Sequence, residues 1–576
     1  MMQSHDEFIF ADFIEKKVVS IYQKGQMKGF ILDHSSSPTS SKEEKHLPNE
    51  MTLETEVKGS ITGDLLVVWD ARNLKPWKFK NITVFDLREA YEAKVRPLSL
   101  RLNDIALDEG LANPEDLVEL DMALKDYENG QSKNLSTLSM SRALWCAKIE
   151  EKYRFLDTLE SLRKLVGAPS FDYVMHGAIL PIELLLKRIA KERRESLPRI
   201  KDRGGSEWYE GGYVLDPPIG FFQDLAIMDF SKYYPSIMMD FNISPEITKI
   251  ENSRLALDFS KKGLIPEALG YLTKTRNEVE EKLGMAERGG LEWLRLSSDR
   301  EAVKVLQNAM YGALASEQFS MQSRALAAAI SALGREGLKE TIAECERKGF
   351  KVIYADTDSV MALVPQDRAE VLAKDLTTHI QEYFIRKYTL PMQKPEIRLK
   401  FSRYARSAIF LGKKNYAFWD GKTVEIVGLF RQARSRFAVQ FQKELFGRVL
   451  EGVPLEEIRQ FYNDTIIRFR KASLEEIALC TVINQPMDKY KVASWHVKGA
   501  RNAEALLGLK FYMGDTIKLI WLKGKPEIIG FEYQGQVEKY RNNIDWERME
   551  DALKALAEPI MNVIGNGAEP RQRTLV

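Results

Sequence analysis

The stretch FKVIYADTDSVMALV, residues 350–364, constrains the fold of this chain more than any other segment. Two apolar, β-branched runs flank Asp356 and Asp358, so the pattern predicts a β-hairpin with both carboxylates at its tip. Aspartate is an ordinary turn residue, because its side chain bonds nearby backbone groups, and a purely structural turn is one interpretation. The other is a divalent-cation site, because hard cations prefer carboxylate oxygens. The second interpretation requires a further carboxylate and a phosphate-binding group elsewhere in the chain.

Length and composition set wide bounds on the fold. The 576 residues allow three or more domains, and 44% apolar with 29% charged residues is typical of a soluble globular protein. No apolar run approaches the roughly 18 residues that a membrane span needs. The acidic start MMQSHDEFIFADFIEKK does not resemble a secretory signal, and the three cysteines form no CxxC pair, which indicates free thiols. Helical patterns over 250–345 and after 438, with strands between 350 and 430, predict several α+β units.

Two further segments supply the groups that a metal site requires. Asp229 ends the strand-like run DLAIMDF and is followed by a turn, which suits a metal ligand. In SSDREAVKVLQNAMYGALAS, residues 297–316, Ser298 and Glu301 form a capping-box pattern that predicts a helix start. The side chains of Lys304, Asn308 and Tyr311 then share one helix face. A cation, an amide and a phenol suit a phosphorylated, ring-bearing ligand, although a solvated helix face is the simpler alternative.

These segments resemble motifs A, B and C of family B DNA polymerases, whose patterns are DxxSLYPSI, KxxxNSxYG and YGDTDS. The matching stretches are DFSKYYPSI (229–237), KVLQNAMYG (304–312) and YADTDS (354–359). Further segments are similar to the YxGG motif, the KKxY motif, the first fingers helix and the thumb: YEGGYV (209–214), KKNYAF (413–418), 264–283 and 490–524.

The resemblance implies an α+β multidomain fold, a right-hand polymerase with palm, fingers and thumb preceded by an RNase H-like exonuclease-type domain. The implied domains are 1–165, exonuclease-like and degenerate; 166–248, linker helices and first palm part; 249–320, fingers; 321–425, second palm part; and 426–576, thumb. Only eleven residues precede Asp12, so the chain is expected to lack the family's amino-terminal domain, as in compact archaeal or viral members.

The resemblance also assigns catalytic roles. It implies a site for two Mg²⁺ ions, with Mn²⁺ as an alternative, whose ligands are Asp229, Asp358 and the backbone of Phe230. Asp356 is expected to tune these acids without binding the metals directly. Two metal ions can stabilise both the attacking and the leaving oxygen of nucleotidyl transfer.

The implied nucleotide-binding residues are Arg276, Lys304, Asn308, Tyr234, Tyr311, Ser231, Lys232 and Tyr233. Arg276 and Lys304 are expected to clamp the triphosphate, and Tyr234 to act as a steric gate against ribonucleotides. The implied DNA-binding residues are Lys413, Lys414, Tyr416, Tyr209, Gly211 and Gly212. Motif A departs from the family pattern at Lys232 and Tyr233, where Ser and Leu are usual. Lys232 is expected either to add a charge to the triphosphate site or to point to solvent.

The exonuclease motifs are less complete. NITVFD (81–86) and YRFLD (153–157) resemble the second and third motifs and supply Asp86 and Asp157. The first motif has two acids two residues apart, whereas Asp12 and Glu15 are three apart and fall on opposite strand faces unless a bulge intervenes. Glu54 and Glu56 have the right spacing but the wrong first acid. These positions are therefore interpreted as an exonuclease remnant.

The resemblance implies template-directed extension of a primer with dNTPs, weak or no proofreading, and a role in repair or damage bypass. Alternatives are a replicative-type polymerase with an active exonuclease, a reverse transcriptase, and a catalytically silent DNA-binding subunit. Adjacent motif C acids would favour the reverse transcriptase, and they are absent here. The expected partners are primer–template DNA, dNTPs and a sliding clamp or other replication or repair proteins, with no membrane. The expected location is the nucleoid-associated cytoplasm or, for a viral protein, the host cytoplasm.

Overall fold

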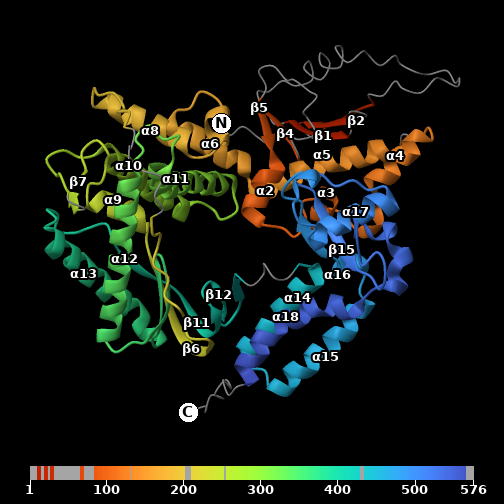
Figure 1. Cartoon of the computed structure of the whole chain (residues 1–576). Coiled ribbons are helices and arrows are strands. Elements are labelled where there is room, and N and C mark those ends of the chain that lie inside the picture. Colours follow the sequence, from red (N-terminus) through yellow and green to blue (C-terminus); the bar gives the residue numbers. More distant parts are fainter. Residues whose placement is uncertain are drawn as a thin grey trace. The chain divides into compact units, whose positions relative to one another are not determined.

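The computed structural model describes residues 9–14, 18–23, 26–31, 65–69, 83–131, 133–200, 209–251, 254–428 and 434–565 (Figure 1). The chain divides into two compact units. The first unit consists of residues 1–159 and 478–544, and the second of residues 160–477 and 545–576. The segment predicted as the thumb therefore contributes to both units, and the division into five domains stays a prediction.

A six-stranded antiparallel sheet forms the centre of the second unit, in the order β13-β12-β11-β6-β10-β9. Its strands are β6 (Gly220–Phe230), β9 (Val352–Asp356), β10 (Ser359–Leu363), β11 (Leu399–Gly412), β12 (Asn415–Trp419) and β13 (Val424–Val427). The predicted hairpin is confirmed, because β9 and β10 pair directly across the turn at Thr357 and Asp358. Leu225, Tyr354 and Phe410 belong to the sheet's buried apolar core, and helices α12 (Arg324–Arg347) and α13 (Gln366–Tyr388) pack against its strands.

A helical group lies beside the end of β6 in the same unit. It contains α8 (Ile179–Glu192), α9 (Tyr233–Asp240), α10 (Leu264–Met285) and α11 (Leu291–Ala315), and the short hairpin β7 (Lys249–Glu251) and β8 (Arg254–Ala256). The predicted start of α11 at Ser298 is wrong. The helix already begins at Leu291 after Gly290, and the Ser298 hydroxyl donates to the Leu294 carbonyl at 3.3 Å inside it. A capping-box pattern therefore does not stop a helix whose apolar face continues upstream.

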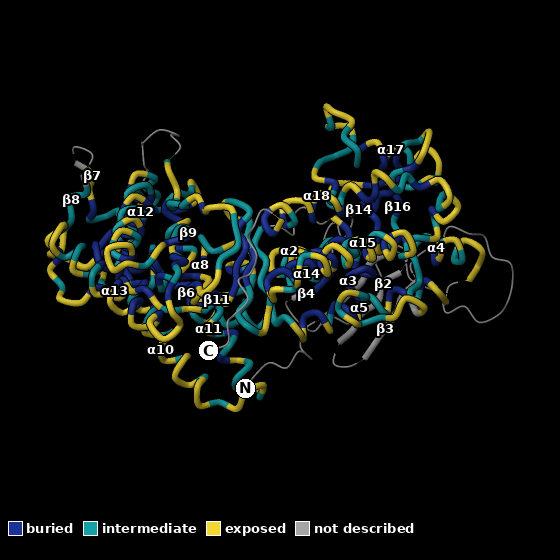
Figure 2. The backbone as a smooth tube through the Cα atoms, turned by 90° about the horizontal axis from the view of Figure 1, so that it is seen from below, coloured by how far each residue is buried: buried dark blue, intermediate teal, exposed yellow. Residues whose placement is uncertain are grey.

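Further helices, from the start and from the C-terminal part of its sequence, complete the second unit. They are α6 (Phe155–Val166, which begins in the first unit), α7 (Asp172–Met175), α14 (Arg436–Glu451), α15 (Leu455–Lys471), α16 (Leu474–Ile477) and α18 (Trp546–Gly565). Helix α14 contacts α15, α16 and α18 as well as the sheet strands β11, β12 and β13. Its buried face carries Phe441, Leu445 and Phe446, and Figure 2 shows the alternation of buried and exposed helix faces. No helix in the described ranges combines the length and apolar character needed to cross a membrane.

The first unit begins with a five-stranded sheet in the order β3-β2-β1-β4-β5. Its strands are β1 (Ile9–Ile14), β2 (Val18–Gln23), β3 (Gln26–Ile31), β4 (Leu65–Val68) and β5 (Thr83–Asp86). The first three strands pair antiparallel, whereas β4 and β5 run parallel to β1, which is the arrangement of an RNase H-like sheet. Helix α5 (Lys133–Tyr153) packs on this sheet, and α2 (Leu87–Val95), α3 (Leu102–Asp108), η3 (Pro114–Asp116) and α4 (Leu120–Glu128) complete this part.

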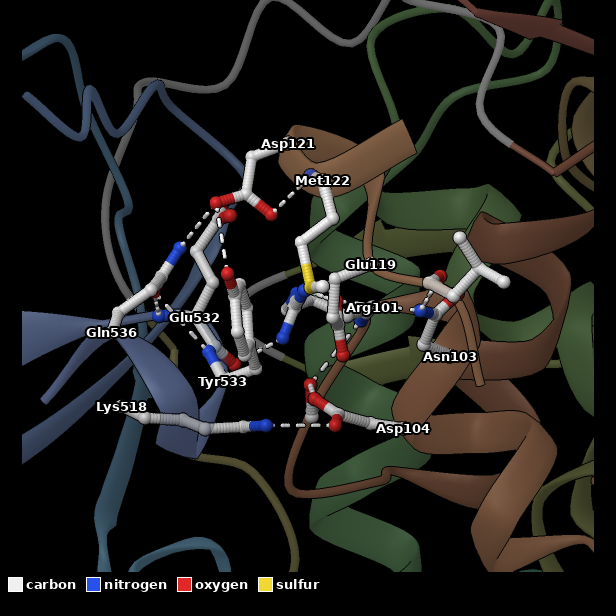
Figure 3. A network of polar contacts seen from close by, with 12 residues as sticks. Arg101, Asn103, Asp104, Glu119, Asp121, Met122, Lys518, Glu532, Tyr533 and Gln536 are labelled. Carbon is white, nitrogen blue, oxygen red and sulfur yellow. Dashed lines mark hydrogen bonds and ion pairs between the residues drawn. The ribbon is translucent and has the colours of Figure 1, made fainter. Parts of the chain in front are cut away.

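A segment from far along the chain packs into the first unit. It contains β14 (Leu479–Val482), β15 (Thr516–Trp521), β16 (Ile528–Phe531), α17 (Trp495–Leu507), η5 (Met487–Lys489), η6 (Gln534–Gln536) and η7 (Glu538–Asn543). A polar network joins this segment to residues around α3 (Figure 3). Lys518 Nζ lies 2.8 Å from Asp104 Oδ1, with 2% and 5% of the two side chains exposed. The Ser99 hydroxyl also donates to Asp104, and Tyr533 donates to Asp121.

Candidate active site

The end of β6 and the tip of the β9–β10 hairpin bring two predicted acids together. Strand β6 pairs with both β10 and β11, and Asp229 lies opposite Ser359 of β10. The backbone N–H of Phe230 donates to the carbonyl of Asp358 at 2.7 Å. Asp229 of motif A and Asp358 of motif C therefore stand on adjacent strand ends although 128 residues lie between them in the chain. This convergence depends on the order of the strands and cannot be inferred from sequence spacing.

The electrostatics of this acidic pair favour a bound cation. Desolvation, followed by the charges of Asp229 and Asp356, raises the pKa of Asp358 to about 6. Desolvation also raises the pKa of Asp229. Within the described residues, no group of three acid, histidine or cysteine side chains is already gathered as a metal site. Two neighbouring carboxylates whose charged forms are destabilised are nevertheless a fitting donor set for a hard divalent ion.

Asp356 differs from the other two acids because protein groups already satisfy its carboxylate. The hydroxyls of Tyr354 and Thr357 donate to it at 3.2 and 2.9 Å. Lys414 Nζ lies 3.0 Å from Asp356 Oδ2. A carboxylate held by two hydroxyls and an ammonium is less available as a direct metal ligand, which agrees with its expected tuning role.

The segment YEGG fixes the hairpin tip. The backbone N–H of Thr357, a residue with φ of 57°, donates to the Tyr213 carbonyl at 2.8 Å. A Cβ on Gly212 would lie only 2.5 Å from Thr357 Oγ1, so the close approach requires glycine there. On α12, Arg335 donates to the Gly211 carbonyl at 2.7 Å. The role of Arg335 was not predicted, because nothing in its local sequence marks it.

The KKNY turn lies next to the hairpin. Lys413 Nζ is 3.0 Å from Asp216 Oδ2, and 48% of the Lys413 side chain is exposed. Tyr416 instead packs inward, with its ring centroid 5.4 Å from that of Tyr354. The turn thus presents two lysines held by acids and one inward-facing aromatic ring. Both lysine side chains are exposed enough to contact a phosphate, whereas Tyr416 supports the turn by packing against Tyr354.

Four tyrosines gather where motif A meets α11. The ring of Tyr234 stacks on that of Tyr311 with centroids 4.3 Å apart, and the Tyr311 hydroxyl is 3.5 Å from the Tyr209 hydroxyl. Tyr233 is buried, and its hydroxyl donates to the Gly334 carbonyl at 2.8 Å. The side chain of Tyr233 is therefore part of the core, so its predicted nucleotide contact can involve only its backbone.

The two predicted phosphate-binding cations lie on neighbouring helices. Arg276 of α10 donates to Glu280 at 2.9 Å, and Lys304 of α11 lies 3.6 Å from Glu301. Helices α10 and α11 pack against each other, and Asn308 is exposed on α11. Partly exposed ion pairs of this kind are worth only about 0–1 kcal/mol, so a polyanion can displace the carboxylates.

Lys232 does not point to solvent, which corrects one of its two predicted orientations. Its Nζ lies 3.3 Å from Thr273 Oγ1 on α10, and the residue is half-buried. The backbone of Lys232 is left-handed, with φ of 53°, and it caps α9 without a side-chain hydrogen bond. The contact with Thr273 depends on how the helices pack, so the sequence contains no signal for it.

The described exonuclease-type acids are engaged in structural contacts. Asp86 caps α2 by accepting the Glu89 N–H at 3.1 Å, and Asp157 pairs with Arg154. The Tyr153 hydroxyl donates to Glu109 at 2.7 Å. The possible bulge in β1 is wrong, because Asp12 and its neighbours pair in regular register with β2 through Ile14. The side chain of Asp12 and the residues Glu15, Glu54 and Glu56 lie outside the described residues.

Comparisons with known proteins point in one direction. A sequence model of DNA polymerase family B matches residues 172–564. A DNA polymerase of Thermococcus gorgonarius is 27% identical over 495 residues, which cover 82% of this chain and 60% of that protein. A DNA polymerase of Desulfurococcus sp. (strain Tok) is 27% identical over 440 residues, covering 72% of this chain and 55% of that protein. The chain thus spans little more than half the length of these relatives.

A solved structure gives the same result for the fold. The family B DNA polymerase from the hyperthermophilic archaeon Pyrobaculum calidifontis matches with a TM-score of 0.65 at 19% identity, covering 96% of this chain and 76% of that one. At this identity the match shows the fold alone. The predicted fold class, an α+β multidomain chain with a right-hand layout, is confirmed.

Proposed function

Because the chain belongs to DNA polymerase family B, we propose that it extends a DNA primer on a DNA template with dNTPs. The observation that carries this proposal is the position of Asp229 beside Asp358 on adjacent strand ends. A catalytically silent DNA-binding subunit would have no need to keep two carboxylates whose pKa values are raised by their surroundings. A reverse transcriptase would leave the KKNY turn and its pairing with motif C without a purpose.

We propose that Asp229, Asp358 and the backbone of Phe230 hold two Mg²⁺ ions, for which Mn²⁺ can substitute. When bound, the ions supply Lewis-acid chemistry to the attacking 3′-hydroxyl and to the leaving pyrophosphate. Asp356 keeps Lys414 and two hydroxyls in place around the pair and adjusts its charge. The protein contributes alignment, since its strands fix both carboxylates before any substrate arrives.

The nucleotide site is proposed to lie between motif A and helices α10 and α11. Arg276 and Lys304 bind the triphosphate, with Asn308 assisting, and the backbone of Lys232 and Tyr233 faces it, whereas the Ser231 N–H donates to the Arg398 carbonyl at 2.9 Å. Tyr234, held by its stacking on Tyr311, meets the sugar and excludes a 2′-hydroxyl. Preorganised donors of this kind stabilise charge that develops in the transition state.

Primer–template DNA is proposed to contact Lys413, Lys414, Tyr209, Gly211 and Gly212, with Tyr416 supporting the two lysines from within the sheet. Proofreading is proposed to be weak or absent, because Asp86 and Asp157 make structural contacts. A polymerase of this type suits repair or damage bypass, in the nucleoid-associated cytoplasm or, for a viral protein, the host cytoplasm. A sliding clamp is a candidate partner.

The test is primer extension with Mg²⁺ and dNTPs by the wild-type chain, Asp229→Asn and Asp358→Asn. Both variants should lose extension and keep near-normal DNA affinity, because the metals serve chemistry more than duplex binding. Asp367→Asn, an exposed aspartate at the start of α13, is the matched control and should extend normally. Extension that persists at the wild-type rate in either active-site variant would refute the proposal.

A further inference from the structure

A single hydroxyl joins motif A to both long helices of the predicted fingers. Thr273 Oγ1 of α10 accepts from Lys232 Nζ at 3.3 Å and from Gln307 Nε2 of α11 at 3.0 Å. The three side chains come from three separate elements of the second unit. We call this group, Lys232, Thr273 and Gln307, the motif A latch.

The latch leaves one buried polar atom unsatisfied. Gln307 is fully buried, and its Oε1 has no hydrogen-bond partner in the described part of the chain. Buried acceptors are usually paired, and an unpaired one is a stored cost. Both lone pairs of the Thr273 hydroxyl are already occupied by N–H donors. The three side chains therefore connect the helices at the cost of one unpaired buried acceptor, Gln307 Oε1.

Lys232 also has a strained backbone and spare donors. Its φ of 53° places a non-glycine residue in the left-handed region at the first turn after Asp229. Such strain persists only where the surrounding structure imposes it, and it gathers at functional sites. An ammonium has three N–H donors, and its contact with a neutral hydroxyl at 3.3 Å is weak. Phosphate oxygens are much stronger acceptors for the same ammonium.

The alternative to a latch is a lysine that merely packs against α10. A packing role requires only the methylene groups, so Met would replace Lys232 without loss. If Lys232 only packs, substitutions of Lys232 and of Thr273 would also affect nucleotide binding independently of each other. These expectations differ from those of a latch and can be measured.

We propose that the Lys232 ammonium exchanges Thr273 for the incoming triphosphate, so that nucleotide binding releases α10 and α11 from motif A. This inference rests on the proposed polymerase function. Without nucleotide, the ammonium ties the two helices to the end of β6. With nucleotide, the polyanion takes the ammonium, and the helices become free to move on the bound substrate. The contact between Lys232 and Thr273 must break before the nucleotide binds. It therefore lowers the apparent affinity for the nucleotide.

The experiment is single-turnover primer extension across a range of dNTP concentrations, which gives an apparent dNTP Kd and a maximum rate for each variant. Lys232→Met should raise the apparent Kd about tenfold, since one charge-assisted contact is lost. Thr273→Val should lower it several-fold, because Lys232 is then free for the triphosphate. The double variant should match Lys232→Met, because Thr273 acts only through the lysine. Thr273→Ser keeps the hydroxyl, so its apparent dNTP Kd should equal that of the wild-type chain.

Lys274→Ser is the matched control, because this neighbouring lysine of α10 is 80% exposed and pairs with Glu278 on its own helix. Its apparent Kd should stay within about twofold of wild type. Hydrogen exchange gives a second readout that needs no nucleotide. Backbone amides of α10 should exchange faster in both Lys232→Met and Thr273→Val than in wild type.

Independent effects in the double variant, or unchanged exchange in Lys232→Met, would overturn the latch. A Thr273→Val variant with a raised Kd would do the same. If Thr273→Val fails to fold, the exchange of α10 in Lys232→Met still decides the question. Failure of the proposed function is distinct, because the wild-type chain would then extend no primer in the same assay.

Discussion

Lys414 Nζ lies 3.0 Å from Asp356 Oδ2, so an ion pair connects the KKNY turn to the tip of the acidic hairpin. The lysine side chain is 63% exposed and the aspartate side chain 21%. An exposed pair contributes little to the free energy of unfolding, about 0–1 kcal/mol. The pair therefore fixes the lysine at the edge of the proposed metal-binding acids more than it stabilises the fold.

Lys414→Met is expected to weaken primer–template binding with little loss of stability. Removing one phosphate contact should reduce the slope of log binding constant against log salt by about 1. Fluorescence anisotropy of a labelled duplex over a salt series measures this slope, and thermal unfolding measures stability. Lys422→Met, an exposed lysine in the next turn of the sheet, is the control and should leave the slope unchanged. An identical slope in both variants would show that Lys414 does not meet the backbone.

Extension should depend on pH through Asp358. Its pKa, raised to about 6, means that the folded protein keeps this proton at a pH where an unfolded aspartate has lost it. As a proposed metal ligand Asp358 must be ionised, so extension at low Mg²⁺ should fall as the pH drops through about 6. Higher Mg²⁺ should move the midpoint to lower pH, because the ion competes with the proton. If the pH midpoint of extension does not change with the Mg²⁺ concentration, a group other than Asp358 controls the rate.

The same shift predicts how stability changes with pH. A raised carboxyl pKa means that the metal-free protein loses stability as pH rises from the unfolded value near 3.9 to about 6. Asp358→Asn should flatten this part of the stability curve, and Mg²⁺ should stabilise the wild-type protein at pH 7 but not the variant. Thermal unfolding across pH 4–8, with and without Mg²⁺, tests both statements. Equal Mg²⁺ stabilisation of both proteins would place the metal site elsewhere.

Tyr234→Ala should raise ribonucleotide incorporation roughly tenfold or more, because one well-placed steric contact is worth about 1–3 kcal/mol. The ratio of dNTP to rNTP incorporation, measured at one template position, gives the result directly. Tyr173→Ala removes an exposed tyrosine from α7 and should not change the ratio. An unchanged ratio in Tyr234→Ala would mean that its stacking on Tyr311 points the ring away from the sugar.

A mismatched, end-labelled primer incubated with Mg²⁺ and no dNTPs should shorten slowly or not at all. The reason is that Asp86 serves as a helix cap and Asp157 as a partner of Arg154. Prompt shortening that disappears in Asp86→Ala would instead assign an active exonuclease and a replicative type of polymerase.

Lys518→Met should destabilise the first unit by about 3–5 kcal/mol, because it leaves the buried Asp104 without its cation. The double variant Lys518→Met with Asp104→Leu should recover most of this loss, since apolar replacement of a whole buried pair is often neutral. Lys498→Met breaks a largely exposed pair with Glu527 in the same unit and should cost less than about 1 kcal/mol. Chemical unfolding monitored in the first unit gives these values, and equal costs for both lysines would contradict the buried-pair argument.

Local patterns predicted local structure well. The hairpin around Asp356 and Asp358 follows from apolar β-branched flanks and a polar turn, and it forms as expected. The helix start at Ser298 was wrong because an apolar face upstream of a capping pattern extends the helix. The placement of Asp229 beside Asp358 followed from the family resemblance, since no spacing rule connects two strands of one sheet.

Contacts that depend on how distant elements pack could not be predicted from the sequence. Tyr233 is buried against Gly334 and Gly337, and a Cβ on Gly337 would collide with the tyrosine hydroxyl. Thr273 meets Lys232 only because α9 and α10 pack together. The pair of Lys518 and Asp104 joins residues 414 positions apart, and each looks like an ordinary surface charge in its own segment.

The first unit is built from residues 1–159 and 478–544, so its two segments are synthesised at different times. A ribosome that has made Asp104 must still make the whole of residues 160–477 before Lys518 exists. At about 5–20 residues per second, this delay is on the order of tens of seconds. Throughout it, the nascent chain lacks the Lys518 ammonium that pairs with Asp104 in the complete fold. Residues 160–477 of the second unit are therefore translated before the first unit can complete its fold.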